Sequence, residues 1–143
     1  MYTYEYTRTV AGRSPQECFD VVTDPSLGAE WVSMASEVRA EGEPGVGRKI
    51  ISKAGLMGVH LEVPAVVHVY DEPTRYGWKS EKPVFSAFEF TFTPEGDDTR
   101  IDAKVDFDPG KIFKLGTGKV AAKKFGSDFD HDLDRLVALI QSH

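Results

Sequence analysis

The sequence predicts an α+β domain in which a long C-terminal helix covers one face of a curved antiparallel sheet of about seven strands. Most of the chain alternates apolar with polar residues in short segments, and proline or glycine turns separate these segments as in a meander of strands. From about residue 118 the apolar period changes from 2 to 3.6, which is the period of a helix. The length of 143 residues fits a single domain.

The N-terminal region is expected to form one strand and two short helices. Residues 2–11 place Tyr2, Tyr4, Tyr6 and Val10 on one face and threonines with Glu5 on the other, which predicts a half-buried strand. The run from Ser14 to Glu17 carries an N-cap serine, a proline at the first helical position and an acid in the first turn, so a helix should begin here and end near Pro25. A second helical turn over residues 26–32 would present Trp31.

The middle of the chain is expected to form six further strands. Their predicted ranges are 36–42, 46–54, 58–71, 75–82, 84–94 and 98–108, with a turn at Ala54-Gly55 between the second and third. Phe88, Phe90 and Phe92 share one face of their strand. Such alternation indicates one buried and one solvated face, as in an antiparallel sheet that is covered on one side.

The final segment, residues 118–140, is predicted to be a helix with a single apolar stripe. The stripe consists of Phe125, Phe129, Leu133, Leu136, Val137 and Ile140. A helix of this length runs roughly 35 Å, which is close to the length of a ten-residue strand at about 3.4 Å per residue. One helix can therefore cover the whole concave face.

Composition argues against several classes of partner and compartment. The net charge of −6 disfavours nucleic acids and anionic membranes as main partners, because phosphate binders normally carry a basic face. No apolar run approaches the roughly 20 residues of a membrane-spanning helix. Cys18 is the only cysteine, which excludes an intrachain disulfide, and the first residues do not resemble a signal peptide, so a cytoplasmic location is expected.

Several motifs, in this order and spacing, resemble the START-like (SRPBCC) superfamily and in particular its polyketide cyclase/dehydrase and lipid transport branch. The motifs are residues 14–24 (SPQECFDVVTD), 30–31 (EW), 45–47 (GVG), 69–73 (VYDEP), 76–78 (YGW) and 132–136 (DLDRL). The resemblance implies a single START-like domain over residues 1–143 with the helix-grip fold. Because such proteins include cyclases, carriers of hydrophobic ligands and stress-response proteins, it leaves the function open.

The inward face of the last helix is uneven, which suggests a cavity. Its first half offers only small residues, and large aromatic side chains stand opposite. This pattern fits either an interlocking packed core or a hollow beneath residues 118–122, and the family resemblance favours the hollow. The residues expected to bind a ligand there are Trp31, Arg48, Ile50, Leu61, Val63, Tyr76, Trp78, Phe88, Phe90, Phe92, Gly118, Ala121, Ala122 and Phe125.

Few residues are candidates for chemistry, and no metal or cofactor is expected. Asp132, at the edge of the stripe, is either an acid or base with a raised pKa or a solvated partner of Arg135. Cys18 fits a small buried hydrophobe better than a nucleophile. His60 and His68 lie about 27 Å apart along one predicted strand, which is too far to share a metal ion.

Three functions remain open. The first is binding or transport of a small hydrophobic molecule, lipid or polyketide-like, with glycines at 110, 116 and 118 allowing the cavity to open. The second is a polyketide aromatase/cyclase or dehydratase that uses the same cavity, although the available polar residues form no recognisable catalytic set; they are Arg48, Tyr76, Ser80, Ser86 and Asp132. The third is a protein-interaction or regulatory domain with a filled core. The sequence specifies neither the ligand nor the oligomeric state.

A lysine-rich stretch precedes the acidic part of the last helix. Its members are Lys111, Lys114, Lys119, Lys123 and Lys124. Cations at a helix N-terminus oppose the helix dipole, so these lysines do not stabilise the helix. They form either a solvated face or a surface that attracts an anionic partner or lipid headgroup at the cavity mouth.

Overall fold

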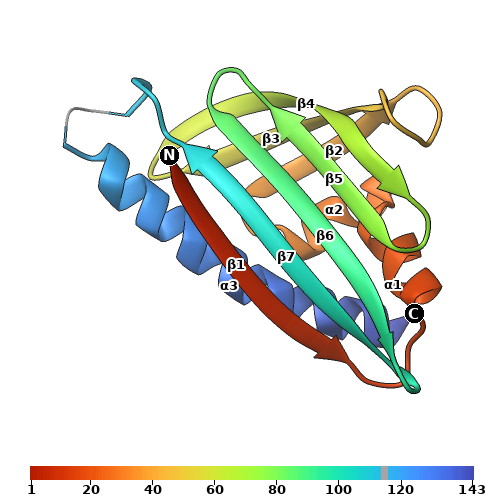
Figure 1. Cartoon of the computed structure of the whole chain (residues 1–143). Coiled ribbons are helices and arrows are strands. Elements are labelled where there is room, and N and C mark those ends of the chain that lie inside the picture. Colours follow the sequence, from red (N-terminus) through yellow and green to blue (C-terminus); the bar gives the residue numbers. More distant parts are fainter. Residues whose placement is uncertain (114–115) are drawn as a thin grey trace.

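The computed structural model describes residues 1–113 and 116–143, and within them it has seven strands, three α-helices and one short 3-10 helix (Figure 1). The elements in chain order are β1 (Tyr2–Val10), α1 (Pro15–Val22), the 3-10 helix η1 (Pro25–Leu27), α2 (Gly28–Trp31), β2 (Ala35–Glu41), β3 (Lys49–Leu56), β4 (Val59–Asp71), β5 (Arg75–Ser80), β6 (Phe85–Glu95), β7 (Asp98–Asp108) and α3 (Gly118–Ser142).

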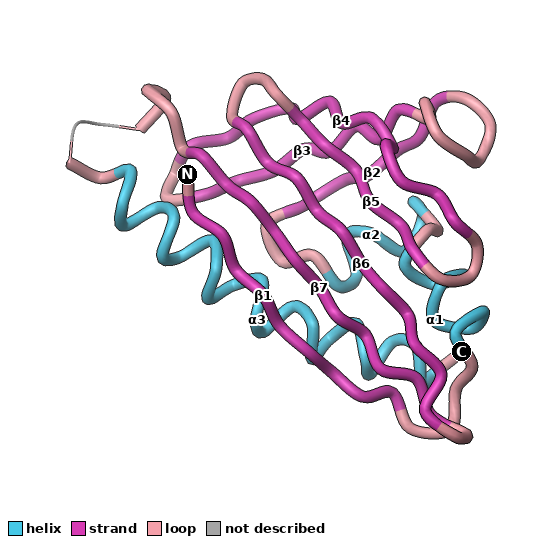
Figure 2. The backbone as a smooth tube through the Cα atoms, viewed as in Figure 1, coloured by secondary structure: helices cyan, strands magenta, loops and turns pink. Residues whose placement is uncertain are grey.

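The strands form one antiparallel sheet in the order β1-β7-β6-β5-β4-β3-β2, so β1 and β2 are its edges. The sheet curves around α3, and the helices lie on its concave side (Figure 2). The predicted α+β fold, with a bent sheet and a long C-terminal helix, is confirmed.

The short helices begin as the sequence predicts. In α1, the Ser14 hydroxyl accepts a hydrogen bond from the Glu17 amide, and the Glu17 carboxylate accepts one from the Ser14 amide, both at 3.1 Å. This reciprocal capping satisfies two amides that have no partner inside the helix. Asp24 caps η1 by accepting from the Ser26 amide at 2.9 Å. The two short helices thereby bring Trp31 into the core, where it is 2% exposed.

One predicted turn is wrong. Ala54 and Gly55 lie inside β3 and pair with Leu61 and His60 of β4, and the chain reverses three residues later at Met57-Gly58. Both turn residues have positive φ, 51° and 79°. A two-residue hairpin of this kind suits the twist of its strands but requires positive φ at both positions, which glycine adopts readily.

The apolar stripe of α3 forms the centre of the core. Phe125, Phe129, Leu133, Leu136 and Ile140 are all buried, as predicted. Phe125 stacks on Phe107 of β7 with ring centroids 4.1 Å apart. This contact fixes the helix against the β7 side of the sheet, and the space that remains lies toward β3 and β4.

Candidate functional site

A cavity of about 150 Å³ lies between the sheet, the η1–α2 region and α3. This is well above the roughly 10–15 Å³ that a single water molecule needs. Its lining is almost entirely apolar. The lining residues are Val22, Thr23, Asp24, Pro25, Gly28, Trp31, Val32, Met34, Ala35, Val38, Ile50, Ser52, Ala54, Gly55, Leu56, Val59, Leu61, Val63, Ala65, Tyr76, Trp78, Val84, Ser86, Phe88, Phe107, Phe113, Phe125 and Phe129.

Strands β3 and β4 supply one wall of the cavity through alternate residues. Ser52 and Ala54 line it from β3, and Leu61, Val63 and Ala65 line it from β4. Alternate residues of a strand point to the same face, so one register places all of these side chains inward. The small side chains at positions 52, 54 and 65 leave space that leucine or phenylalanine would fill.

Aromatic rings form a second wall. Trp78 of β5 stacks on Phe88 of β6, with centroids 4.7 Å apart and planes 17° from parallel. The edge of Phe129 from α3 meets Phe88 at 5.4 Å, with planes 70° apart. These rings come from two strands and the helix and pack against one another. Their broad faces suit an apolar ligand.

The hydroxyl groups of Thr23, Ser52, Tyr76 and Ser86 interrupt the apolar lining. Neither the Tyr76 nor the Ser86 hydroxyl makes a hydrogen bond to another described residue, and both residues line the cavity. Burial raises the pKa of Tyr76 to about 12, although the nearby positive charge of Arg48 opposes the rise. At neutral pH Tyr76 is therefore protonated and can donate a hydrogen bond to a polar group on a ligand.

The structure brings together many of the residues that the sequence put forward for ligand binding. Those that line the cavity are Trp31, Ile50, Leu61, Val63, Tyr76, Trp78, Phe88 and Phe125. Those that do not line it are Arg48, Phe90, Phe92, Gly118, Ala121 and Ala122. The binding role of the lining residues stays a prediction.

The cavity does not lie beneath residues 118–122, where the sequence placed it. That part of α3 packs against β1: the Tyr4 hydroxyl donates to the Ala122 carbonyl at 2.8 Å, and the Tyr6 hydroxyl donates to the Gly126 carbonyl at 2.9 Å. A Cβ atom on Gly126 would lie 2.6 Å from the Tyr4 ring. The small helical residues therefore accommodate tyrosines from the edge strand, which is the packed alternative.

The other three residues outside the cavity have neighbours that explain their positions. Phe90 meets the edge of Trp31 with centroids 6.0 Å apart, and Phe92 meets Phe19 of α1 at 6.0 Å. Both phenylalanines thus pack beneath the short helices. Arg48 is half-buried just before β3, where its carbonyl accepts from the Val67 amide at 2.9 Å.

Several lining residues were not expected from the sequence. They include Val22, Met34, Ala35, Val38, Ser52, Ala54, Leu56, Val59, Ala65, Phe107, Phe113 and Phe129. The alternation that identified Ile50, Leu61 and Val63 also includes Ser52, Ala54 and Ala65, so the period of 2 could have found these. No pattern along the chain could have placed Met34 or Phe113, because their positions depend on how loops pack onto the sheet.

Asp132 has a structural contact and does not line the cavity. The residue is fully buried, so the expectation of a solvated edge residue is wrong, whereas its pairing with Arg135 is confirmed. It also accepts a hydrogen bond from the Ser33 amide at 3.1 Å. Burial raises the pKa of Asp132, and the hydrogen bonds from Ser33 partly oppose this rise. The carboxylate joins α3 to the segment that follows α2.

The remaining candidates do not form a reactive site. Cys18 is buried, and burial raises the pKa of its thiol to about 11, which disfavours the nucleophilic thiolate. Residues 1–113 and 116–143 contain no group of three histidine, cysteine or acidic residues that could hold a metal ion. Among the described helices, none is both long and apolar enough to cross a membrane.

A curved antiparallel sheet that wraps a long C-terminal helix around an apolar cavity defines the helix-grip class of ligand-binding folds. The chain belongs to the polyketide cyclase/dehydrase and lipid transport family, whose model matches residues 1–141. A comparison with curated protein sequences returned no significant match.

Solved structures share this fold at low sequence identity. TTHA0849 from Thermus thermophilus is 16% identical with a TM-score of 0.82, and the match covers 99% of this chain and 98% of that protein. A START superfamily protein from Mycobacterium smegmatis is 14% identical with a TM-score of 0.78 and coverage of 98% and 97%. The di-domain ARO/CYC BexL from the BE-7585A biosynthetic pathway is 19% identical with a TM-score of 0.67, over 99% of this chain and 50% of BexL.

Proposed function

We propose that this protein, as one START-like domain over residues 1–143, binds or transports a small hydrophobic molecule of lipid or polyketide-like chemistry. The observation that carries the proposal is the cavity of about 150 Å³ with its almost wholly apolar lining. Burial of a ligand's apolar surface there would supply roughly 25 cal/mol per Å². The unpaired hydroxyls of Tyr76 and Ser86 would orient a ligand that carries a polar group.

The character of the lining favours binding over catalysis. A cyclase or dehydratase needs an acid or base that touches the substrate. Asp24 and Tyr76 are the ionisable residues among the described lining. Asp24 already accepts hydrogen bonds from the amide and the hydroxyl of Ser26, and the raised pKa of Tyr76 makes it a poor base at neutral pH. Likewise, a protein-interaction domain with a filled core does not account for the cavity.

Two measurements test the proposal. Native mass spectrometry of freshly purified protein should detect a co-purifying apolar molecule, or uptake of one after incubation. In a fluorescence titration, the neutral dye N-phenyl-1-naphthylamine should bind at one site per chain. Val63→Phe places a ring in the cavity, and because overpacking costs about 1–3 kcal/mol, dye affinity should fall by about tenfold or more.

The matched control is Val66→Phe, which makes the same change on the same strand at an exposed position outside the cavity. This variant should bind the dye as the wild-type protein does. Equal dye binding by wild-type protein and Val63→Phe, with both folded by circular dichroism, would remove the cavity as the binding site. No uptake of any apolar molecule by the wild-type protein would remove the proposed function itself.

A further inference from the structure

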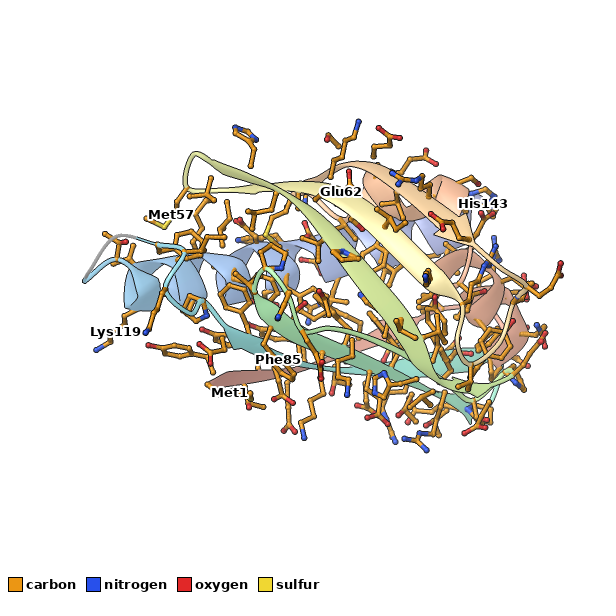
Figure 3. All side chains as sticks on the ribbon, turned by 90° about the horizontal axis from the view of Figure 1, so that it is seen from above. Met1, Met57, Glu62, Phe85, Lys119 and His143 are labelled. Atoms are coloured by element: carbon orange, nitrogen blue, oxygen red, sulfur yellow. The ribbon has the colours of Figure 1, made fainter. Side chains whose placement is uncertain are left out.

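One end of the molecule brings together the β3–β4 hairpin, residues 109–113 after β7, and the first turns of α3. Figure 3 shows Met57 and Lys119 at this end, and Figure 1 places the same segments together. We call this surface the basic end and define it by Met57, residues 109–113 and residues 116–123. The cavity reaches it, because Leu56 beside the hairpin turn and Phe113 both line the cavity.

The charge of the basic end is opposite to that of the whole chain. Residues 109–127 contain five lysines and no aspartate or glutamate, although the chain has a net charge of −6. Lys111, Lys119 and Lys123 are exposed, and none of them pairs with a carboxylate of the described residues. Lys124 pairs with Asp128. Lys114 lies outside the residues that the structure describes.

Exposed apolar side chains project among these lysines. Met57 at the hairpin tip is 40% exposed, Ile112 is 37% exposed, and Val120 in the first turn of α3 is 55% exposed. Single exposed apolar residues are ordinary on a protein surface. Here three of them project from separate segments at the end that the cavity reaches, and unpaired cations flank them.

Stability does not explain this arrangement. Lys119 lies in the first turn of α3, where the helix dipole disfavours a cation. Neither Lys119 nor Lys123 gains a carboxylate partner among residues 1–113 and 116–143. Val120 and Ile112 leave apolar surface in water. A surface with lysines around projecting apolar side chains matches the boundary of an anionic bilayer, where lysines meet headgroup phosphates and apolar groups enter the acyl boundary.

We propose that the basic end docks onto the surface of an anionic phospholipid bilayer, so that the part of the cavity lined by Leu56 and Phe113 lies nearest the lipid. A soluble acidic protein is the alternative partner. A stable protein interface buries about 800 Å² on each side, whereas the apolar groups here stand on three separate segments, which suits shallow insertion better. The docking residues Lys119, Lys123 and Val120 do not line the cavity, so docking and ligand binding can fail independently.

The test is flotation of the full-length protein with vesicles of phosphatidylcholine alone or with 30% phosphatidylglycerol, at low and high salt. Wild-type protein should bind the anionic vesicles at low salt and be released by 0.5 M NaCl, because salt screens surface charges. The double variant Lys119→Gln/Lys123→Gln should bind about 25-fold more weakly, at about fivefold per lysine. Val120→Ser should also weaken binding, without changing its dependence on salt.

The control is Lys49→Gln/Lys104→Gln, which removes the same charge from exposed strand positions outside the basic end and should bind as wild type does. Equal binding by wild type and the Lys119/Lys123 variant would overturn the proposal, as would retention on polyglutamate without binding to vesicles. Dye binding in the absence of vesicles separates the two proposals. Val63→Phe should bind the dye weakly and bind anionic vesicles as wild type does. The Lys119→Gln/Lys123→Gln variant should bind the dye as wild type does and bind the vesicles weakly.

Discussion

Gly126 is a position where a single methyl group should destabilise the protein even though it favours the helix. A Cβ atom there would lie 2.6 to 2.8 Å from three atoms of the Tyr4 ring. The ring cannot move away freely, because its hydroxyl donates to the Ala122 carbonyl at 2.8 Å. Gly126→Ala therefore forces either a shift of α3 away from β1 or a rotation of Tyr4 that breaks this hydrogen bond.

The opposing contributions can be compared. Replacing glycine by alanine inside a helix stabilises it by about 1 kcal/mol. Overpacking costs about 1–3 kcal/mol, and losing the hydrogen bond costs about 1 kcal/mol more. Gly126→Ala should therefore lower the free energy of unfolding by about 2 kcal/mol, as measured by urea denaturation followed by circular dichroism.

The sign should reverse when the tyrosine is removed. In a Tyr4→Ala background, Gly126→Ala should raise the free energy of unfolding by about 1 kcal/mol, because only the helix preference remains. The exposed neighbouring position offers a control, Ser127→Ala, which should stabilise by a few tenths of a kcal/mol in either background. Stabilisation by Gly126→Ala in the otherwise wild-type protein would refute the explanation of the small helical residues as receptors for tyrosine rings.

Two further predictions concern stability. Because burial raises the pKa of Asp132 above its ordinary 3.8, the folded state holds that proton more tightly, and stability should fall as pH rises from 3.8 through the raised pKa. Asp132→Asn should lack this fall in stability while keeping an acceptor for the Ser33 amide. Asp132→Ala should lower the free energy of unfolding by about 1–3 kcal/mol more than Asp132→Asn does. Identical pH profiles of stability for wild type and Asp132→Asn would contradict the role of the Asp132 proton. Leu61→Ala, beside the cavity, should cost about 1–2 kcal/mol, and Leu133→Ala, fully packed in the core, about 4 kcal/mol. Equal losses in thermal or urea unfolding would mean that the cavity wall is as tightly packed as the core.

The sequence predicts the elements well because their signals are local. The capping box at Ser14, the alternation through residues 98–108 and the stripe of α3 each depend on neighbours within a few residues, and each element forms close to its expected bounds. The β3–β4 turn was misplaced by three residues, because Ala54-Gly55 looked like a turn while Met57 is an unusual residue at positive φ. The position of the turn is set by the pairing of β3 with β4, which joins Leu56 to Val59.

The location of the cavity could not be predicted, because it depends on which strands α3 contacts. Small residues on the helix face fit a hollow and a close approach equally well. Deciding between them requires knowing that β1 lies beside β7, so that its tyrosines reach residues 122 and 126 of the helix. Alternation correctly implies which residues of β3 and β4 face the cavity. It does not identify the wall across from these strands, which α2 and the loops supply.

The two halves of the sheet therefore differ in how closely they are packed. Toward β1 and β7, α3 packs closely through Tyr4, Gly126 and the stacked Phe107–Phe125 pair, and this half accounts for much of the buried core. Toward β3 and β4, α2 spans only four residues, and the facing positions 52, 54 and 65 carry small side chains, so space remains there. Because dense packing and empty space lie on different strands, sequence changes along β3 and β4 can alter the size and shape of the cavity at small cost to the core. This separation would let one fold accept different hydrophobic ligands.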